Sequence, residues 1–186
     1  MSAQLERWHF NVDQYYRLAE VGVLQPDDRV ELIEGEIIRM PPIGSAHAGH
    51  VNRLELLLKK CLGEGAIVAV QNPVRLYDFS EPVPDIAVLK PRDDFYTTSH
   101  PTAEDVLVIV EVSDATILTD RNVKVPLYAR ADVPEVWLVN LPNRIIEVYG
   151  TPAAGAYTDS TTFGLGEQLH SLTVPNLSLR VEEIIG

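Results

Sequence analysis

An acidic side chain interrupts the most apolar run of the sequence. Residues 106–112 read Val-Leu-Val-Ile-Val-Glu-Val, which is typical of a strand buried on both faces, and alternation places Glu111 on the same side as Leu107 and Ile109. A carboxylate buried without a partner is costly or changes its protonation, so a chain that keeps one there has a use for it. The alternative is that Glu111 ends the strand and reaches water.

A second carboxylate, Asp85, begins another short apolar run after Pro84. The Pro-Asp pair alone is ordinary turn chemistry. A hard divalent cation, however, needs oxygen ligands from separate strands that meet at one point, with positions left open for water and a phosphate, and Asp85 and Glu111 meet that demand. Two residues after Glu111 the chain has Ser113, not a lysine, so Lys124 in the next helical segment is the candidate basic group.

The elements that must position these residues are read from periodicity and turn signals. Pro126 would cost ~3 kcal/mol deep in a helix, which places Lys124 in or just before a first turn. The pattern predicts helices over 11–24 with Asn11 as N-cap, 45–63 with Ser45 as N-cap, and 120–132; a hairpin over 30–40 that turns at Glu34-Gly35; strands over 67–70, 74–77, 85–89, 106–112, 135–140 and 145–149; a surface excursion over 151–162; and a C-terminal edge segment over 177–185. This order predicts one α/β or α+β domain over residues 1–186.

Composition limits the classes of function. The 186 residues are 46% hydrophobic, and no run is long enough to cross a bilayer. The first ten residues carry no export signal and the single cysteine, Cys61, cannot form an internal disulfide, so we expect a cytoplasmic, reduced protein. The formal net charge of -12 disfavours extensive nucleic-acid binding, although a bound cation and a few basic side chains can reverse the sign inside one cleft.

The ordered combination of these motifs resembles the Uma-type endonuclease family of the PD-(D/E)XK superfamily, and the similarity covers nearly the whole chain. The residues that carry it are Pro84-Asp85, Glu111-Val112-Ser113, 120–124 with Tyr128-Ala129, and 134–139, preceded by 31–36, Met40-Pro41-Pro42, His47 and 71–76. The resemblance implies a restriction-endonuclease-like mixed β-sheet flanked by helices. It also implies that Asp85 and Glu111 hold Mg²⁺ (or Mn²⁺), that Lys124 replaces the superfamily lysine, that DNA is the substrate, and that two subunits form a homodimer.

Three further residues match the family at positions that imply an accessory role. Glu31 is either an additional metal or water ligand or an exposed residue of the hairpin; His47 could line the site, and Gln71 begins a matching segment. A metal shared by His47 and His50 is disfavoured, because no Cys or acidic residue has zinc-site spacing. Trp137 and Tyr149 are interpreted as core residues of late strands, not as base-stacking platforms.

Three functions are consistent with the sequence. The first is metal-assisted hydrolysis of a phosphodiester, with Asp85 and Glu111 placing the cation and Lys124 orienting water or neutralising charge. The second is an inactive nuclease fold kept as a binding or dimerisation module, which the acidic balance and the displaced lysine favour. The third is a carboxylate-pair hydrolase of small substrates such as sugars. Whether Asp85 and Glu111 converge, with the Lys124 amine nearby, separates these hypotheses.

Overall fold

The computed structural model describes residues 6–186. Residues 1–5, part of the N-terminal stretch in which the sequence predicts no export signal, lie outside the described residues. Within the described part of the chain, no helix is both long enough and apolar enough to cross a membrane.

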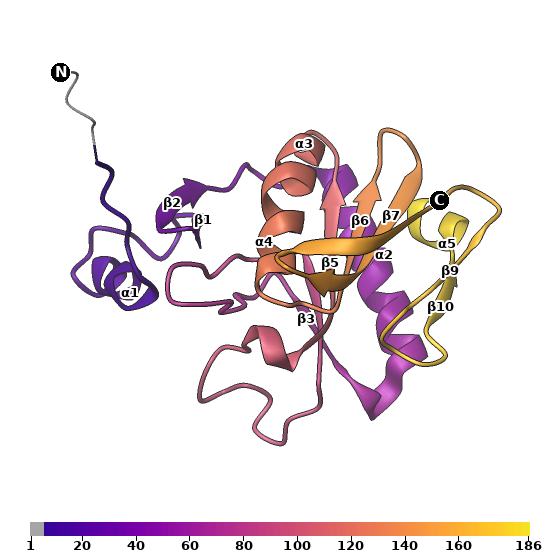
Figure 1. Cartoon of the computed structure of the whole chain (residues 1–186), viewed down its shortest axis with the longest axis horizontal. Coiled ribbons are helices and arrows are strands. Elements are labelled where there is room, and N and C mark those ends of the chain that lie inside the picture. Colours follow the sequence, from indigo (N-terminus) through magenta and orange to yellow (C-terminus); the bar gives the residue numbers. More distant parts are fainter. Residues whose placement is uncertain (1–5) are drawn as a thin grey trace.

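A six-stranded mixed sheet forms the centre of the molecule, with the strand order β3-β4-β5-β6-β7-β8 (Figure 1). Only β5 and β6 pair in parallel; the other neighbours are antiparallel. The helical segment between β5 and β6 is the crossover that a parallel pair requires. The strands span Ile67–Val70 (β3), Ile86–Leu89 (β4), Val106–Ser113 (β5), Glu135–Asn140 (β6), Ile145–Ala153 (β7) and Ala156–Phe163 (β8).

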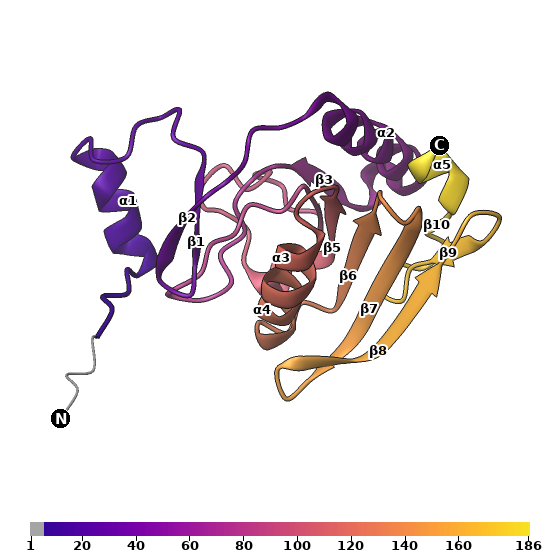
Figure 2. The ribbon, with the colours of Figure 1, turned by 90° about the horizontal axis from the view of Figure 1, so that it is seen from above.

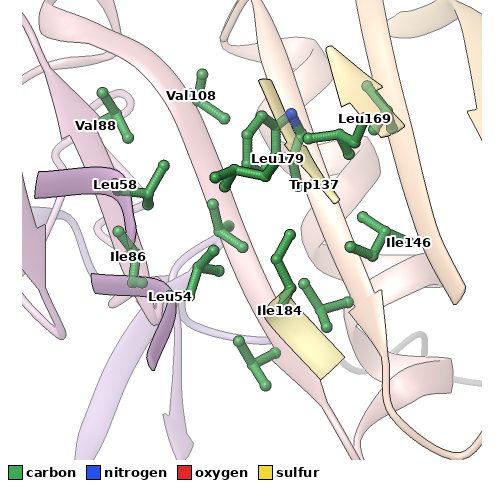
Figure 3. Close-up of a cluster of buried hydrophobic side chains, with 14 of the residues drawn as sticks. Leu54, Leu58, Ile86, Val88, Val108, Trp137, Ile146, Leu169, Leu179 and Ile184 are labelled. Carbon is green, nitrogen blue, oxygen red and sulfur yellow. The ribbon is translucent and has the colours of Figure 1, made fainter. Parts of the chain in front are cut away.

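Helices cover both faces of this sheet, as Figure 2 shows for α2 on one side and α3 and α4 on the other. The face under α2 and α5 holds the larger apolar cluster, which includes Leu54, Leu58, Trp137 and Ile184 (Figure 3). The opposite face holds a second cluster that contains Tyr128 of α4. The helices are α2 (Ser45–Leu62), α3 (Ile117–Thr119), the π-helical η3 (Asp120–Lys124), α4 (Val125–Arg130) and α5 (Val181–Ile185), with short 3₁₀ turns η1 (Gly63–Gly65) and η2 (Ala103–Asp105).

Two groups of small elements flank the sheet at opposite ends. At one end lie α1 (Val12–Glu20) and the hairpin of β1 (Val30–Ile33) and β2 (Glu36–Arg39); at the other end, β9 (Gln168–His170) pairs with β10 (Ser178–Arg180), which leads into α5 (Figures 1 and 2). The Asn11 side chain accepts a hydrogen bond from the Gln14 backbone N–H at 2.8 Å, so the predicted N-cap is present. The hairpin turns at Glu34-Gly35 as predicted, and Gly35 adopts a φ of 81° that favours glycine.

The structure corrects the prediction that residues 151–162 form a surface excursion. β7 continues to Ala153, and β8 pairs with it along its length after a turn at Ala154-Gly155. Pro152 is tolerated in β7 because β6 pairs with this strand only as far as Gly150, so one side of the strand is open at Pro152. The Thr and Tyr side chains of β8 suit an exposed edge strand. The C-terminal edge segment is a short strand followed by a helix.

Three smaller predictions are also wrong in detail. Ser45 is the first residue of α2 and makes no capping bond, because Gly44 holds the N-cap position. Residues 74–77 form no ladder: their backbone N–H groups bond to loop carbonyls, including those of Pro82 and Pro101. α1 ends at Glu20, not at residue 24, because Gly22 turns the chain with a φ of 77°.

Candidate active site

Asp85 and Glu111 come together where β4 begins beside the end of β5. The antiparallel register pairs Ile86 with Val110, so Asp85 and Glu111 are the next residues along the ladder. The Val112 backbone N–H donates to Asp85 Oδ2 at 2.9 Å, which fixes this carboxylate against β5. Both carboxylates line one pocket of about 500 Å³. The structure therefore places them on neighbouring strands in one cleft, as the sequence predicts.

Glu111 is a buried carboxylate, with 3% of its surface exposed. Its side chain lies on the α4 face with Ile109, but Leu107 packs on the other face, because a bulge opposite Leu89 breaks the expected alternation. Burial raises the pKa of Glu111 to about 8, and the charge of Asp120 adds to the effect while Lys124 opposes it. The alternative that Glu111 simply reaches water is thus excluded.

Lys124 enters this site from the helical side. The predicted helix begins earlier than residue 120, at Ile117, and widens into the π turn η3, whose last residue is Lys124. Pro126 follows in α4, but the helical run is continuous from Ile117 to Arg130, so the prediction that Lys124 lies in or just before a first turn is wrong. The helix accommodates Pro126 directly after the π turn, where the hydrogen-bond register changes and the Val125 N–H bonds to the Asp120 carbonyl. The Lys124 ammonium lies 3.2 Å from Glu111 Oε1. Burial lowers its pKa, but the surrounding carboxylates outweigh this effect and raise it, so the amine stays charged.

Glu31 of β1 is the second carboxylate that contacts Lys124, at 3.2 Å. Its Oε2 atom also accepts a hydrogen bond from the Val83 backbone N–H at 3.0 Å. With 5% of its surface exposed, Glu31 is not an exposed hairpin residue, so that alternative is wrong. The lysine is held between carboxylates of two separate sheets.

His47 and Gln71 approach Asp85 from outside the sheet. His47, in the first turns of α2, has its Nε2 atom 2.9 Å from Asp85 Oδ1, and this hydrogen bond raises the pKa of the imidazole. Gln71 directs its amide Nε2 toward the same oxygen at 3.4 Å, from a left-handed backbone conformation with a φ of 51°. Both predicted accessory residues therefore line the pocket with Asp85.

Two residues of this site belong to the motifs that carry the family resemblance, but no role in the site was predicted for them from the sequence. The Tyr128 hydroxyl donates to Glu111 Oε1 at 2.6 Å, and the buried Asp120 accepts from the Ser113 hydroxyl at 2.6 Å. They stand four residues after and four residues before Lys124, a helical spacing that brings side chains to one face. This spacing in the sequence was the signal that could have identified both residues.

Other candidates lie outside the site. His50 Nδ1 contacts the Ala46 carbonyl and Nε2 the Ile185 carbonyl, so its ring joins α2 to the C-terminus. Trp137 is fully buried and donates to Glu135, and Tyr149 bonds to Glu147. Over residues 6–186, no group of three or more His, Cys, Asp or Glu side chains is arranged to hold a metal ion.

The donor chemistry of the pocket is nevertheless compatible with Mg²⁺. This ion prefers oxygen ligands and is usually held by one or two carboxylates, with water and substrate phosphates completing its shell. Asp85 and Glu111 supply two such carboxylates on adjacent strands, at the wall of a pocket that has room for a phosphate. A third protein ligand is not needed for this type of site.

Comparisons with known proteins agree with this architecture. The crystal structure of a "putative nuclease belonging to DUF820" from Anabaena variabilis ATCC 29413 superposes with a TM-score of 0.68, covering 95% of this chain and 97% of that chain at 16% sequence identity, and thus confirms the predicted fold. No curated protein matches the chain. The model of the family described as "Uma2: Putative restriction endonuclease" matches residues 12–182. The chain therefore belongs to the Uma2 family.

Proposed function

We propose that this chain is a metal-dependent endonuclease that hydrolyses phosphodiester bonds of DNA. The observation that carries the proposal is the convergence of Asp85, Glu111 and the Lys124 amine in one pocket, with 3.2 Å between the amine and Glu111. Two carboxylates that can hold a cation, next to a fixed ammonium, suit the charge that develops on a phosphate under attack. Membership of the Uma2 family and the nuclease fold support nucleic acid as the substrate.

Asp85 and Glu111 would hold Mg²⁺ or Mn²⁺. When bound, the ion polarises a phosphate oxygen and lowers the pKa of an attacking water. The chain's own residues do the remaining work. His47 and the Val112 N–H orient the two oxygens of Asp85, and the Tyr128 hydroxyl fixes Glu111 through a hydrogen bond to Oε1.

Lys124 stabilises the negative charge that develops on the reacting phosphate. Its amine is pre-positioned by Glu31 and Glu111, so little reorganisation is needed when the substrate enters. Glu31 keeps the amine in place if the substrate complex weakens the contact with Glu111. Water attacks the phosphorus and loses a proton to solvent, one P–O ester bond breaks, and the departing alkoxide takes up a proton from solvent, so no covalent intermediate with the protein is required.

One observation favours the alternative of an inactive fold that serves as a binding or dimerisation module. Both oxygens of Asp85 are already hydrogen-bonded, and Lys124 is paired with Glu31 and Glu111. A site whose charges are satisfied internally can be structural. The net charge of -12 also opposes tight binding to long nucleic acid. The proposed function therefore requires that a divalent ion displaces part of this pairing.

The test combines cleavage with metal binding. Wild-type protein is incubated with labelled DNA oligonucleotides in Mg²⁺, Mn²⁺ or EDTA, beside Asp85→Asn and the control Asp159→Asn, which changes an exposed carboxylate of β8. We expect metal-dependent cleavage by wild type and the control, and none by Asp85→Asn.

A thermal melt with Mn²⁺ gives an independent readout of the site. At a hundredfold excess over Kd, stabilisation of about 2.7 kcal/mol should raise Tm by several degrees in wild type and in Asp159→Asn only. Absence of cleavage with every divalent metal would replace this proposal with the binding-module alternative.

A further inference from the structure

The pocket is lined by two chemically different sets of residues. Besides the reacting groups, the lining includes apolar side chains of β2 and of the segment that follows, and Ile38 of β2 pairs with Glu31 of β1. Ile38 is 36% exposed and Ile43 42% exposed, so these side chains face open space instead of a core. Arg29 Nη1 donates to the Pro41 carbonyl at 2.9 Å and holds the segment in place. We call these residues the apolar wall: Ile38, Met40, Pro41, Pro42 and Ile43.

The reacting groups lie deep in this pocket. At most 6% of the surface of each of Glu31, Glu111 and Lys124 is exposed, so a phosphate must enter the pocket to reach them. The volume of about 500 Å³ is that of a small-molecule site and admits a phosphate with its attached sugar and base. A duplex presents its phosphates on the outside of a stiff rod, whereas a flexible single strand can bend so that one phosphate and its neighbouring base enter a pocket together. Proteins that bind single strands cover the bases as well as the backbone.

The distribution of charge points in the same direction. A duplex carries a negative charge every ~1.7 Å, and proteins that bind along it neutralise many phosphates with Lys and Arg. Among residues 6–186, the pocket lining outside the reacting groups offers only Arg29 and Arg39 as permanent cations, within a chain of net charge -12. Contact with one or two nucleotides is therefore favoured over contact with a long duplex tract.

We infer that the substrate of this pocket is an unpaired DNA strand, whose scissile phosphate lies against Asp85 and Glu111 while an adjoining base packs on the apolar wall. This inference rests on the proposed function and specifies its substrate class. An exposed base has an apolar face that needs cover once it leaves the stack, and the apolar wall supplies this cover beside the reacting groups.

The first experiment compares substrates of one sequence in Mn²⁺: a single-stranded oligonucleotide, the blunt duplex, and the duplex with an unpaired bubble. We expect kcat/KM for the single strand to exceed that for the blunt duplex by at least tenfold, with cleavage of the third substrate confined to the bubble. A duplex cut as fast as the single strand would overturn the inference and leave the proposed function standing. Failure to cut any of the three substrates would overturn both.

The second experiment tests the apolar wall itself. Ile43→Ser removes an exposed apolar side chain from a loop, and Leu165→Ser makes the same type of change at a 49% exposed leucine that does not line the pocket. Loss of the apolar contact should raise KM for the single strand about fivefold in Ile43→Ser, with kcat and Tm close to wild type. Leu165→Ser should leave all three values unchanged. Equal KM values for Ile43→Ser and wild type would show that no base packs on the apolar wall.

Discussion

Replacing Lys124 with methionine separates charge stabilisation from metal binding. Methionine keeps much of the length and apolar stem of lysine but removes the ammonium. At the 3.2 Å that separates Lys124 Nζ from Glu111 Oε1, two unit charges interact by about 5 kcal/mol at an effective dielectric constant of 20. A half charge that develops at the same distance gains about half of this, which corresponds to a rate loss on the order of 10²-fold. We expect Lys124→Met to lose this factor or more in kcat.

Metal binding should respond differently. Asp85 and Glu111 remain in Lys124→Met, and removal of a competing ammonium from Glu111 leaves the Mn²⁺-induced rise in Tm intact. Glu111→Gln should instead lose both cleavage and the Mn²⁺ response. Lys124→Arg should not restore the rate, because the wider planar guanidinium does not reproduce a compact ammonium in this buried position.

Folding must be controlled in this experiment, because Lys124 compensates buried carboxylates. Removing one partner of a buried ion pair costs about 3–5 kcal/mol. The double variant Glu31→Gln/Lys124→Met removes one charge of each sign, so it should recover part of the lost Tm without recovering cleavage. Single-turnover cleavage in Mn²⁺ and thermal melts on the same samples provide both readouts. If Lys124→Met folds, binds Mn²⁺ and cleaves at the wild-type rate, the role assigned to Lys124 is wrong.

Three further predictions concern the rest of the molecule. The buried Glu135 carboxylate accepts hydrogen bonds from the Trp137 indole and from the 171–173 loop. Glu135→Gln should therefore lower the free energy of unfolding by about 3 kcal/mol in urea titrations, and an unchanged midpoint would contradict this. Burial raises the pKa of Glu147, but hydrogen bonds from Arg121, Tyr149 and Asn140 outweigh burial and lower the pKa. Glu147 therefore stabilises the fold above its unfolded pKa and loses this effect as the pH falls, so Glu147→Gln should flatten the loss of stability below about pH 5. Sedimentation at tens of micromolar should show a homodimer, and a monomer alone would refute the prediction of assembly.

Local patterns were sufficient to predict most of the elements, since each depends on residues close in sequence. The Asn11 cap, the Glu34-Gly35 turn and the apolar run before Glu111 act within a few residues. The errors arose where distant partners decide the outcome. Residues 74–77 have strand-forming side chains but no neighbouring strand to pair with, whereas residues 156–163 pair with β7 despite a composition typical of loops.

In the candidate site, too, features set by nearby residues could be predicted and contacts between distant residues could not. Asp85 and Glu111 could be predicted as neighbours, because Asp85 directly precedes one apolar strand and Glu111 lies near the end of another. The pairing of Glu31 with Lys124 could not, since it joins residues that lie far apart in the sequence and on separate elements. The burial of Glu31 depends on how the hairpin of β1 and β2 lies against the sheet, which no local pattern specifies. Tertiary packing therefore determines which carboxylate completes the site.

Ser113 gives a physical reason why the lysine can stand on a helix in this chain. It occupies the position two residues after Glu111, and its hydroxyl donates to the buried carboxylate of Asp120 at 2.6 Å. Asp120 begins the π turn η3, and Lys124 ends it, so this hydrogen bond fixes the start of the turn against β5. The wider π turn then brings the Lys124 amine to Glu111. A lysine at position 113, two residues after Glu111 on the strand, would have approached the same carboxylate. Ser113 thus anchors the helical segment that carries Lys124, so Ser113 on the strand and Lys124 on the helix together place the ammonium beside Glu111.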